Sequence, residues 1–254
     1  MTKKMIAFDL DDTLSITKSA IAPRMSELLI ALLERYDVCV ISGASVEQLY
    51  AQVTSQLSIE PHHLEYLHLM PTCGTRYYRF DSALNDWKMQ YSNEPTSEQK
   101  RHAAEVLTAV AKELGMWPDQ PYGEVIEDRG SQVTLAALGQ DAPAEVKYAW
   151  DPTGEKKLAI RNAAAPLLLD LEVHAAGTTS VDVTLKDINK AYGMYQLMDH
   201  ATVAMDEILF IGDKLDEGGN DYPVKAMGID TIAVEKWQDT ALVIETLVKT
   251  TPAR

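Results

Sequence analysis

The chain has 254 residues and a mass of 28.2 kDa, with 46% hydrophobic and 24% charged residues. This length can bury a substantial core in one large α/β domain or in two smaller ones. The formal charge of -15 and the pI of about 4.8 argue against a general binder of nucleic acid or anionic membranes, which needs a basic surface. A phosphorylated ligand would therefore need a local cationic pocket or a metal ion.

Two cysteines, Cys39 and Cys73, are present, and they fit neither a disulfide framework nor a metal-binding spacing. The first residues are basic, but Asp9 interrupts the apolar stretch that follows them, so this stretch does not have the form of a signal peptide. No uninterrupted apolar run approaches the length of a membrane span. We therefore expect a cytoplasmic protein that binds neither membranes nor nucleic acid.

The first predicted strand, residues 5–9, is an apolar run that leads to two carboxylates, Asp9 and Asp11. Alternate side chains of a strand share a face, so both would point the same way if the strand continued. The turn at Thr13 indicates instead a strand end that opens into a loop. Mg²⁺ prefers such oxygen ligands and usually shares its coordination sphere with a substrate phosphate. For this segment alone, an acidic strand end in an acidic protein is an equally good interpretation.

Strand-like runs alternate with amphipathic helices at both ends of the chain, which is typical of βαβ units and a parallel sheet. A helix is expected to begin at Pro23, because apolar residues over 25–33 follow the stripe of a core-facing helix. A short apolar strand over residues 38–41 ends at Ser42-Gly43. Strands and helices resume this order from Asn189 to the end of the chain.

Between about residues 75 and 185 the pattern changes to hairpins and helices in blocks. The expected elements are a hairpin over residues 77–91, a helix over 103–114, strands over 124–127 and 132–138, a helix from 155 that Pro166 shortens, and strands over 171–175 and 180–185. Such blocks indicate an inserted α+β module. The predicted fold is α/β, with a doubly wound parallel-sheet core at residues 1–81 and 188–254 and the inserted domain at 82–187.

A second acidic strand end follows residues 208–212, where an apolar run leads to Asp213 and then to Asn220-Asp221. In an open parallel sheet, ligands bind outside the carboxyl ends of the strands, so Asp213 is expected to face Asp9 and to complete a metal site. A glycine-rich solvated turn would explain the glycines of this segment but not its match to the first strand.

Two further residues would supply groups that phosphoryl transfer needs. Ser42 offers a hydroxyl and nearby backbone amides at the end of the second strand, and Lys190 offers a positive charge near the start of a helix. Taken singly, a Ser-Gly pair is usually a turn and a lysine is usually a surface charge. Their order along the chain, between the two acidic strand ends, favours the functional interpretation.

Together these segments resemble the four motifs of the haloacid dehalogenase-like superfamily, in the family order and over nearly the whole chain: Asp9-x-Asp11-x-Thr13, Ser42, Lys190, and Gly212-Asp213 with Asn220-Asp221. The resemblance implies that Asp9 is the nucleophile that forms an aspartyl-phosphate and that Asp11 is the general acid and then the base. It also implies that Mg²⁺ is held by Asp9, the Asp11 carbonyl and Asp213.

The same resemblance assigns supporting roles to other residues. Asn220 and Asp221 would support the metal loop, Ser42 and Lys190 would act in catalysis, and Thr13 and Gly43 would contact the substrate phosphate. Asp12 stands where many members of the superfamily carry glycine.

The inserted module resembles the α/β cap of the sugar-phosphate phosphatases, and within that branch the nearest resemblance is to eukaryotic-type phosphomannomutases. Ile126-Glu127-Asp128-Arg129 is similar to the start of their substrate strand, and Ser180-Val181-Asp182-Val183 lies upstream of Lys190 at their spacing. The resemblance implies that five residues contact a sugar phosphate: Lys18, Arg129, Lys147, Ser180 and Asp182.

Departures from the phosphomannomutase pattern bear on the substrate. Gln140 and Lys147 stand where two cap arginines would bind a second phosphate, and Lys18 also replaces an arginine. Glutamine lacks the bidentate charged fork of arginine, and lysine replaces it only as a point charge.

We therefore expect a Mg²⁺-dependent enzyme with net phosphatase activity toward a small sugar phosphate. Phosphomannomutase is the alternative, and a non-catalytic sugar-phosphate sensor is a more distant one. The oligomeric state stays open, with a homodimer as one candidate.

Overall fold

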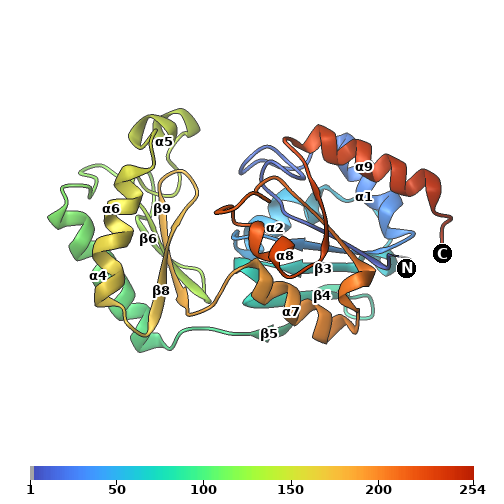
Figure 1. Ribbon diagram of the computed structural model, residues 1–254, viewed down its shortest axis with the longest axis horizontal. Helices are drawn as coiled ribbons and strands as arrows, with labels where there is room; N and C mark the ends of the chain where they lie inside the picture. Colours follow the sequence, from blue (N-terminus) through green and yellow to red (C-terminus); the bar gives the residue numbers. More distant parts are fainter. Residues whose placement is uncertain (1–2) are drawn as a thin grey trace. The chain divides into compact units, whose positions relative to one another are not determined.

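The computed structural model describes residues 3–254 and forms two compact units. The first unit, here called the core, runs through Ser92 and resumes at Asn189, and the second, the cap, comprises Asn93–Ile188 (Figure 1). The expected boundary after residue 81 was too early, because β5 (Asp86–Ser92) pairs with β4 (Arg76–Asp81) and extends the core sheet. The hairpin at residues 77–91 was predicted correctly, but it belongs to the core.

The core contains a seven-stranded sheet with the order β11-β10-β1-β2-β3-β4-β5. Its other strands are β1 (Met5–Phe8), β2 (Asp37–Ile41), β3 (Leu67–Met70), β10 (Ile208–Gly212) and β11 (Asp230–Ala233). The five strands from β11 to β3 are parallel, whereas β4 and β5 are antiparallel additions at one edge. The predicted doubly wound parallel sheet is confirmed.

Both faces of the central parallel strands β1, β2, β3 and β10 are buried, as their apolar sequences require. Ile6 and Phe8 point to one face, into a cluster with helices α1 and α9, whereas Met5 and Ala7 point to the other face, into a cluster with α7 and α8. The core helices are α1 (Pro23–Leu33), α2 (Val46–Gln52), α3 (Pro61–Leu64), α7 (Lys190–Ala201), α8 (Tyr222–Ala226) and α9 (Trp237–Thr250).

The cap contains a four-stranded antiparallel sheet with the order β6-β7-β9-β8. Its strands are β6 (Ile126–Asp128), β7 (Gln132–Ala136), β8 (Leu171–Ala176) and β9 (Ser180–Leu185), and its helices are α4 (Ser97–Glu113), α5 (Ala144–Trp150) and α6 (Glu155–Ala164). One face of the sheet packs against α4 and α6 through apolar residues such as Val133 and Val183 (Figure 1). This is the α+β arrangement that the sequence predicted.

Several predicted local signals have the expected geometry. Pro23 is the first residue of α1, and α6 ends before Pro166. The structure also shows a capping box of Ser45 and Gln48 at the start of α2. The short elements α3, β3, α5 and α8 were not predicted, because four to seven residues are too few to show a clear period. In the described part of the chain, no helix is both long and apolar enough to cross a bilayer.

Candidate active site

The candidate active site lies at the carboxyl ends of the central parallel strands. The chain proceeds outward from β1 to β2 and β3, and it later returns to place β10 on the other side of β1. The order of the strands therefore reverses between β1 and β10, which is where open α/β sheets bind ligands. Asp9 follows β1, and its amide donates to the carbonyl of Ile211 in β10, so it lies directly at this reversal.

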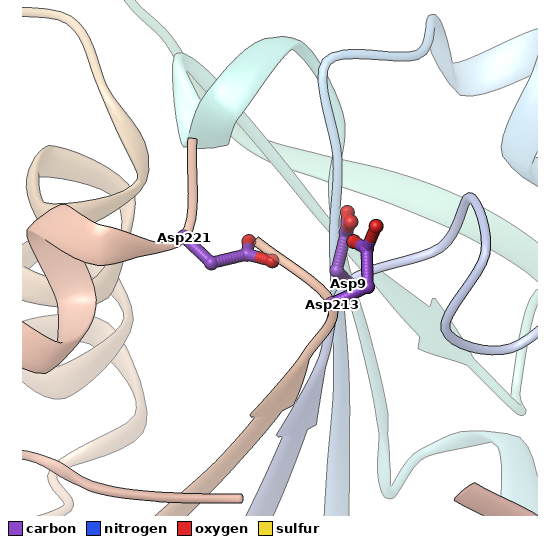
Figure 2. Close-up of side chains that lie close together, drawn as sticks. All are labelled: Asp9, Asp213 and Asp221. Atoms are coloured by element: carbon purple, nitrogen blue, oxygen red, sulfur yellow. The ribbon is translucent and has the colours of Figure 1, made fainter. Parts of the chain in front are cut away.

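The structure brings Asp9, Asp213 and Asp221 together, with a carboxylate oxygen from each within 4.8 Å of the others. Figure 2 shows the carboxylates of Asp9 and Asp213 side by side, with that of Asp221 reaching toward them from the α8 side. The prediction that Asp9 and Asp213 face each other is confirmed by this cluster.

Lys190, the first residue of α7, lies inside this acidic cluster with its side chain 1% exposed. Its ammonium lies 2.6 Å from Asp9 Oδ1 and 2.5 Å from Asp221 Oδ1. Burial raises the pKa of Asp9, and the neighbouring Lys190 opposes this effect. Burial also disfavours the charged form of Lys190, but Asp9 and Asp221 outweigh it, so the net pKa of Lys190 is raised. Lys190 is therefore a fixed positive charge beside Asp9.

Asp221 is fully buried and has both carboxylate oxygens engaged. Oδ1 accepts from Lys190, and Oδ2 accepts from the backbone amide of Lys214. A Cβ at Gly212 would lie 2.5 Å from Asp221 Oδ2, so only glycine admits this approach. Through these contacts Asp221 holds the loop after β10 in place. This is the loop that Asp221 was expected to support. Asn220, the other residue expected to support this loop, is exposed.

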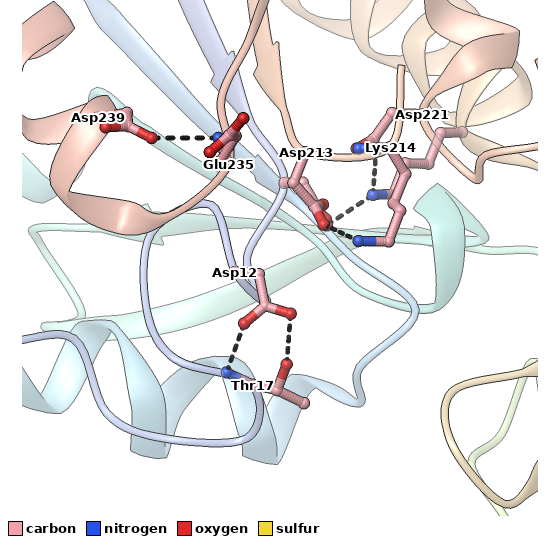
Figure 3. A network of polar contacts seen from close by, with 9 residues as sticks. Asp12, Thr17, Asp213, Lys214, Asp221, Glu235 and Asp239 are labelled. Atoms are coloured by element: carbon pink, nitrogen blue, oxygen red, sulfur yellow. Dashed lines mark hydrogen bonds and ion pairs between the residues drawn. The ribbon is translucent and has the colours of Figure 1, made fainter. Parts of the chain in front are cut away.

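The donor set of the cluster fits a divalent cation. Three carboxylates are opposed by the ammonium of Lys190 and by that of Lys214, which contacts Asp213 Oδ2 (Figure 3). One negative charge remains uncompensated, and the available ligand atoms are hard oxygens of the kind that Mg²⁺ takes. Both oxygens of Asp221 accept from donors, whereas Lys190 and Lys214 contact one oxygen each of Asp9 and Asp213, so Asp9 and Asp213 are the better placed direct ligands.

The side chain of Asp11 does not join the acidic cluster. Its Oδ1 accepts a hydrogen bond of 2.7 Å from the backbone amide of Lys18, in the loop between β1 and α1. Burial raises the pKa of Asp11, while the bond from Lys18 opposes this rise. The predicted contribution of Asp11 to a metal site would have to come from its main-chain carbonyl. The side chain of Lys18 is exposed, so what Lys18 brings to Asp11 is its amide.

Ser42 lies at the end of β2, 3% exposed, in a loop that other backbone segments hold. Its amide donates to the carbonyl of Met70, and its carbonyl accepts from the amide of Cys73. A Cβ at the adjacent Gly43 would meet no atom within 4 Å, so open space lies beside this residue. Thr13, by contrast, is fully buried, and among the described residues its hydroxyl has no hydrogen-bond partner.

Two glycines, Gly74 and Gly193, allow helix α7, which begins with Lys190, to pack closely against its neighbours. A Cβ at Gly193 would lie 2.4 Å from Ile41 Cδ1 and 2.7 Å from the carbonyl oxygen of Cys73, and a Cβ at Gly74 would lie 2.4 Å from Gly193 Cα. The helix therefore packs directly against the strand end and the turn that carry the Ser42 loop. The role of Gly193 was not predicted from the sequence, where a lone glycine within a helix usually signals only a weaker helix.

Three of the cap residues predicted to bind substrate, Asp182, Arg129 and Lys147, make polar contacts within the cap. Asp182 accepts 2.8 Å from the hydroxyl of Thr134, and burial raises its pKa while Arg129 and Thr134 oppose the rise. Arg129 donates 2.7 Å to Glu127, and buried Lys147 donates 2.8 Å to the carbonyl of Gln140. Ser180 is half-buried on β9, two residues before Asp182.

The strand register of the cap sheet places several polar residues on the same face of the sheet. Glu127, Thr134, Asp182 and His174 are paired in sequence across β6, β7, β9 and β8, so they form one row, whereas the neighbouring valines face the helices. The row carries acids and a histidine rather than cations.

The fold and this acidic, lysine-containing strand edge define a phosphotransfer enzyme of the haloacid dehalogenase-like superfamily. A haloacid dehalogenase-like hydrolase from Bacteroides thetaiotaomicron is 16% identical, with 97% of this chain and 100% of that chain covered and a TM-score of 0.64. An IMP-nucleotidase from Plasmodium falciparum, also 16% identical, covers 97% of this chain and 70% of its own with a TM-score of 0.69. These structures share the fold.

The chain belongs to the eukaryotic phosphomannomutase family, whose family model matches residues 25–250. A probable phosphomannomutase of Caenorhabditis elegans is 25% identical over 89% of this chain and 87% of its own length. A phosphomannomutase of Dendrobium officinale is 24% identical over 87% of this chain and 84% of its own. Asp9 and Asp11 precede the matched range, so their interpretation depends on the geometry of the site.

Proposed function

We propose that this enzyme is a Mg²⁺-dependent phosphatase of a small sugar phosphate. The Asp9 carboxylate attacks phosphorus, and the bond from phosphorus to the sugar oxygen breaks while Asp11 donates a proton to that oxygen. Water then attacks the aspartyl-phosphate, Asp11 takes the proton from the water, and the P–O bond to Asp9 breaks to release phosphate. The position of Asp9 at the strand reversal, beside the buried ammonium of Lys190, is the observation that supports this proposal most strongly.

Lys190 keeps its charge throughout, since Asp9 and Asp221 hold its pKa high. It orients Asp9 through Oδ1, which leaves Oδ2 for the attack or for a metal ion. Ser42 and Gly43 are proposed to donate to phosphoryl oxygens, because they lie at a neighbouring strand end with open space beside Gly43. Mg²⁺ bound by Asp9, Asp213 and the Asp11 carbonyl would stabilise the charge that develops on the phosphoryl group.

The state of the cap cations favours hydrolysis over isomerisation. A mutase must hold a bisphosphorylated intermediate, and its cap therefore needs free positive charge for a second phosphate. Here Arg129 is paired with Glu127, and Lys147 is bound to the carbonyl of Gln140. Losing one charged hydrogen bond costs about 1.5 to 3 kcal/mol, or about tenfold or more in binding. We therefore assign Arg129, Lys147, Ser180 and Asp182 to recognition of the sugar rather than of a second phosphate.

Phosphomannomutase activity is the second candidate, because the family match extends over residues 25–250. The two functions differ in their products. Purified enzyme with Mg²⁺ is incubated with mannose 1-phosphate, with and without a hexose bisphosphate activator, and both free phosphate and isomeric sugar phosphate are measured. Free phosphate without isomer is expected, and conversion to the 6-phosphate that needs the activator would overturn the phosphatase proposal.

A panel of sugar phosphates and other small phosphate esters extends this assay, with Asp9→Asn as the inactive control. Phosphate release from any of them by the wild type, and not by Asp9→Asn, is the expected result. A protein that binds one ester tightly but releases nothing from any would instead be a sensor.

A further inference from the structure

The loop between β1 and α1 is held together by Asp12. The amide of Asp12 donates to the carbonyl of Ser15, and its carboxylate accepts 3.2 Å from the amide of Thr17 and 2.7 Å from the hydroxyl of Thr17 (Figure 3). The next amide, that of Lys18, donates to Asp11 Oδ1. Four hydrogen bonds thus connect Asp11 and Asp12 to Ser15, Thr17 and Lys18 on the far side of the loop.

Backbone conformation indicates that this arrangement is built rather than incidental. Asp12 has a φ of 60° and Lys18 a φ of 59°, so both ends of the segment lie in the left-handed region that disfavours side chains. Aspartate tolerates this region better than most residues because its side chain can hydrogen-bond locally. Glycine would adopt the conformation freely, but glycine cannot supply the two bonds to Thr17.

We propose that Asp12 and Thr17 form a clamp that positions the Asp11 carboxylate for its part in the reaction. The clamp fixes Thr17, which places the amide of Lys18 on Asp11 Oδ1 and leaves Oδ2 to exchange a proton with the substrate. This inference rests on the proposed function of Asp11. Asp12 and Thr17 are positioning residues, since neither is required to touch substrate.

The orientation matters because a general acid must lie within hydrogen-bond reach of the oxygen that it protonates. Without the clamp, Thr17 and Lys18 would lose two of their anchors, and Asp11 would sample other rotamers. Misplacement of a catalytic group lowers kcat while leaving ground-state binding nearly unchanged. The expected signature is therefore a loss in kcat with little change in KM.

Four variants test the clamp, with phenyl phosphate as substrate and Mg²⁺ present, because the departing oxygen of this ester benefits from a proton supplied by Asp11. Asp12→Gly removes both bonds and relieves backbone strain, and urea denaturation checks that the variant remains folded under the assay conditions. Thr17→Val removes the hydroxyl bond with little change in shape. Both should lower kcat about tenfold with KM within about twofold. Asp12→Asn, which can accept from the Thr17 amide and donate to its hydroxyl, and Thr17→Ser should each retain kcat within about threefold.

Amide hydrogen exchange at Thr17 and Lys18 supplies a readout that needs no turnover. Exchange should accelerate in Asp12→Gly and Thr17→Val, and it should stay near the wild-type rate in Asp12→Asn. Wild-type kcat or wild-type exchange in Asp12→Gly would overturn the clamp. An equal loss in Asp12→Asn would also overturn it, because the charge rather than the hydrogen bonds would then be responsible.

Asp9→Asn is measured in parallel so that the two proposals fail separately. Turnover by Asp9→Asn would reject the proposed nucleophile, whatever the clamp variants do. An inactive Asp9→Asn together with a fully active Asp12→Gly would reject the clamp alone.

Discussion

The ammonium of Lys190 lies 2.6 Å from Asp9 Oδ1 and 2.5 Å from Asp221 Oδ1, so one buried charge joins the segments after β1 and β10. Asp221 is fully buried and Lys190 is almost so. Removal of the ammonium would leave carboxylates buried beside one another without a counter-charge. Lys190 therefore contributes to the stability of the core as well as to the proposed chemistry.

Lys190→Met is expected to lower the free energy of unfolding by about 3–5 kcal/mol, since it breaks a buried ion pair from one side. Turnover should also be lost. Lys214→Met is the control, because this lysine is 60% exposed and its pair with Asp213 should contribute about 1 kcal/mol or less. Urea denaturation of both variants measures the difference. A Lys190→Met protein as stable as Lys214→Met would contradict the buried-pair interpretation.

Mg²⁺ should stabilise the folded core through the acidic cluster. At ten times its dissociation constant, the ion would add about 1.4 kcal/mol, or roughly 4 °C in Tm. Asp213→Asn should abolish this shift, whereas Asp216→Asn, an exposed position in the same loop, should preserve it. Thermal unfolding with Mg²⁺ and with chelator tests this expectation. An undiminished shift in Asp213→Asn would place the ion elsewhere.

Gly193→Ala should displace α7, because the added Cβ would lie 2.4 Å from Ile41 Cδ1 and 2.7 Å from the carbonyl oxygen of Cys73. Such overpacking costs about 1–3 kcal/mol, and here it would also shift Lys190 relative to Asp9. Asp199→Ala, at an exposed position of the same helix, should change stability by about 0.5 kcal/mol or less. Both stability and kcat are measured. If Gly193→Ala matched Asp199→Ala in both, the close packing would be refuted.

His68 should make the core less stable as the pH falls. Burial lowers the pKa of His68 from 6.5 to about 3, with Arg79 and Arg254 adding to the effect, while Tyr77 bonds its Nδ1. Between these values the unfolded chain binds a proton that the folded one does not, so the free energy of unfolding decreases as pH falls below about 6.5. From pH 6 to pH 5 this contribution is about 1 kcal/mol.

His68→Asn tests this slope, because asparagine can replace Nδ1 without titrating. The variant should be less stable than the wild type at pH 7, where a cavity is its main defect. Its stability should decrease by about 1 kcal/mol less than that of the wild type from pH 6 to pH 5. Parallel pH dependences in denaturation would show that His68 is not the titrating group.

Much of the core was predictable from the sequence because its signals are local. Residues 5–9 and 208–212 are apolar runs that each lead to an aspartate, and strand ends of a parallel sheet meet at one edge, which brings Asp9 near Asp213. The edge hairpin was assigned to the wrong unit because antiparallel strands look alike in a core and in an insertion. The pairing of β4 with β3 is what assigns the hairpin to the core.

Other features depend on contacts that no local pattern encodes. The bonds from Asp12 to Thr17 are made with Asp12 in a left-handed backbone conformation, which nothing in the local sequence predicts. The close contact between Gly74 and Gly193, which allows α7 to pack here, joins segments more than a hundred residues apart. Such contacts require the assembled fold.

The central claim is that Asp9 carries the phosphoryl group during turnover. Wild-type enzyme is quenched with acid during hydrolysis of a phosphorus-labelled substrate and then digested, and the labelled peptide is identified by mass spectrometry. The label should reside on the peptide that contains Asp9, and it should be absent from Asp9→Asn. Label on another residue, or Asp9→Asn turnover at the wild-type rate, would contradict the mechanism.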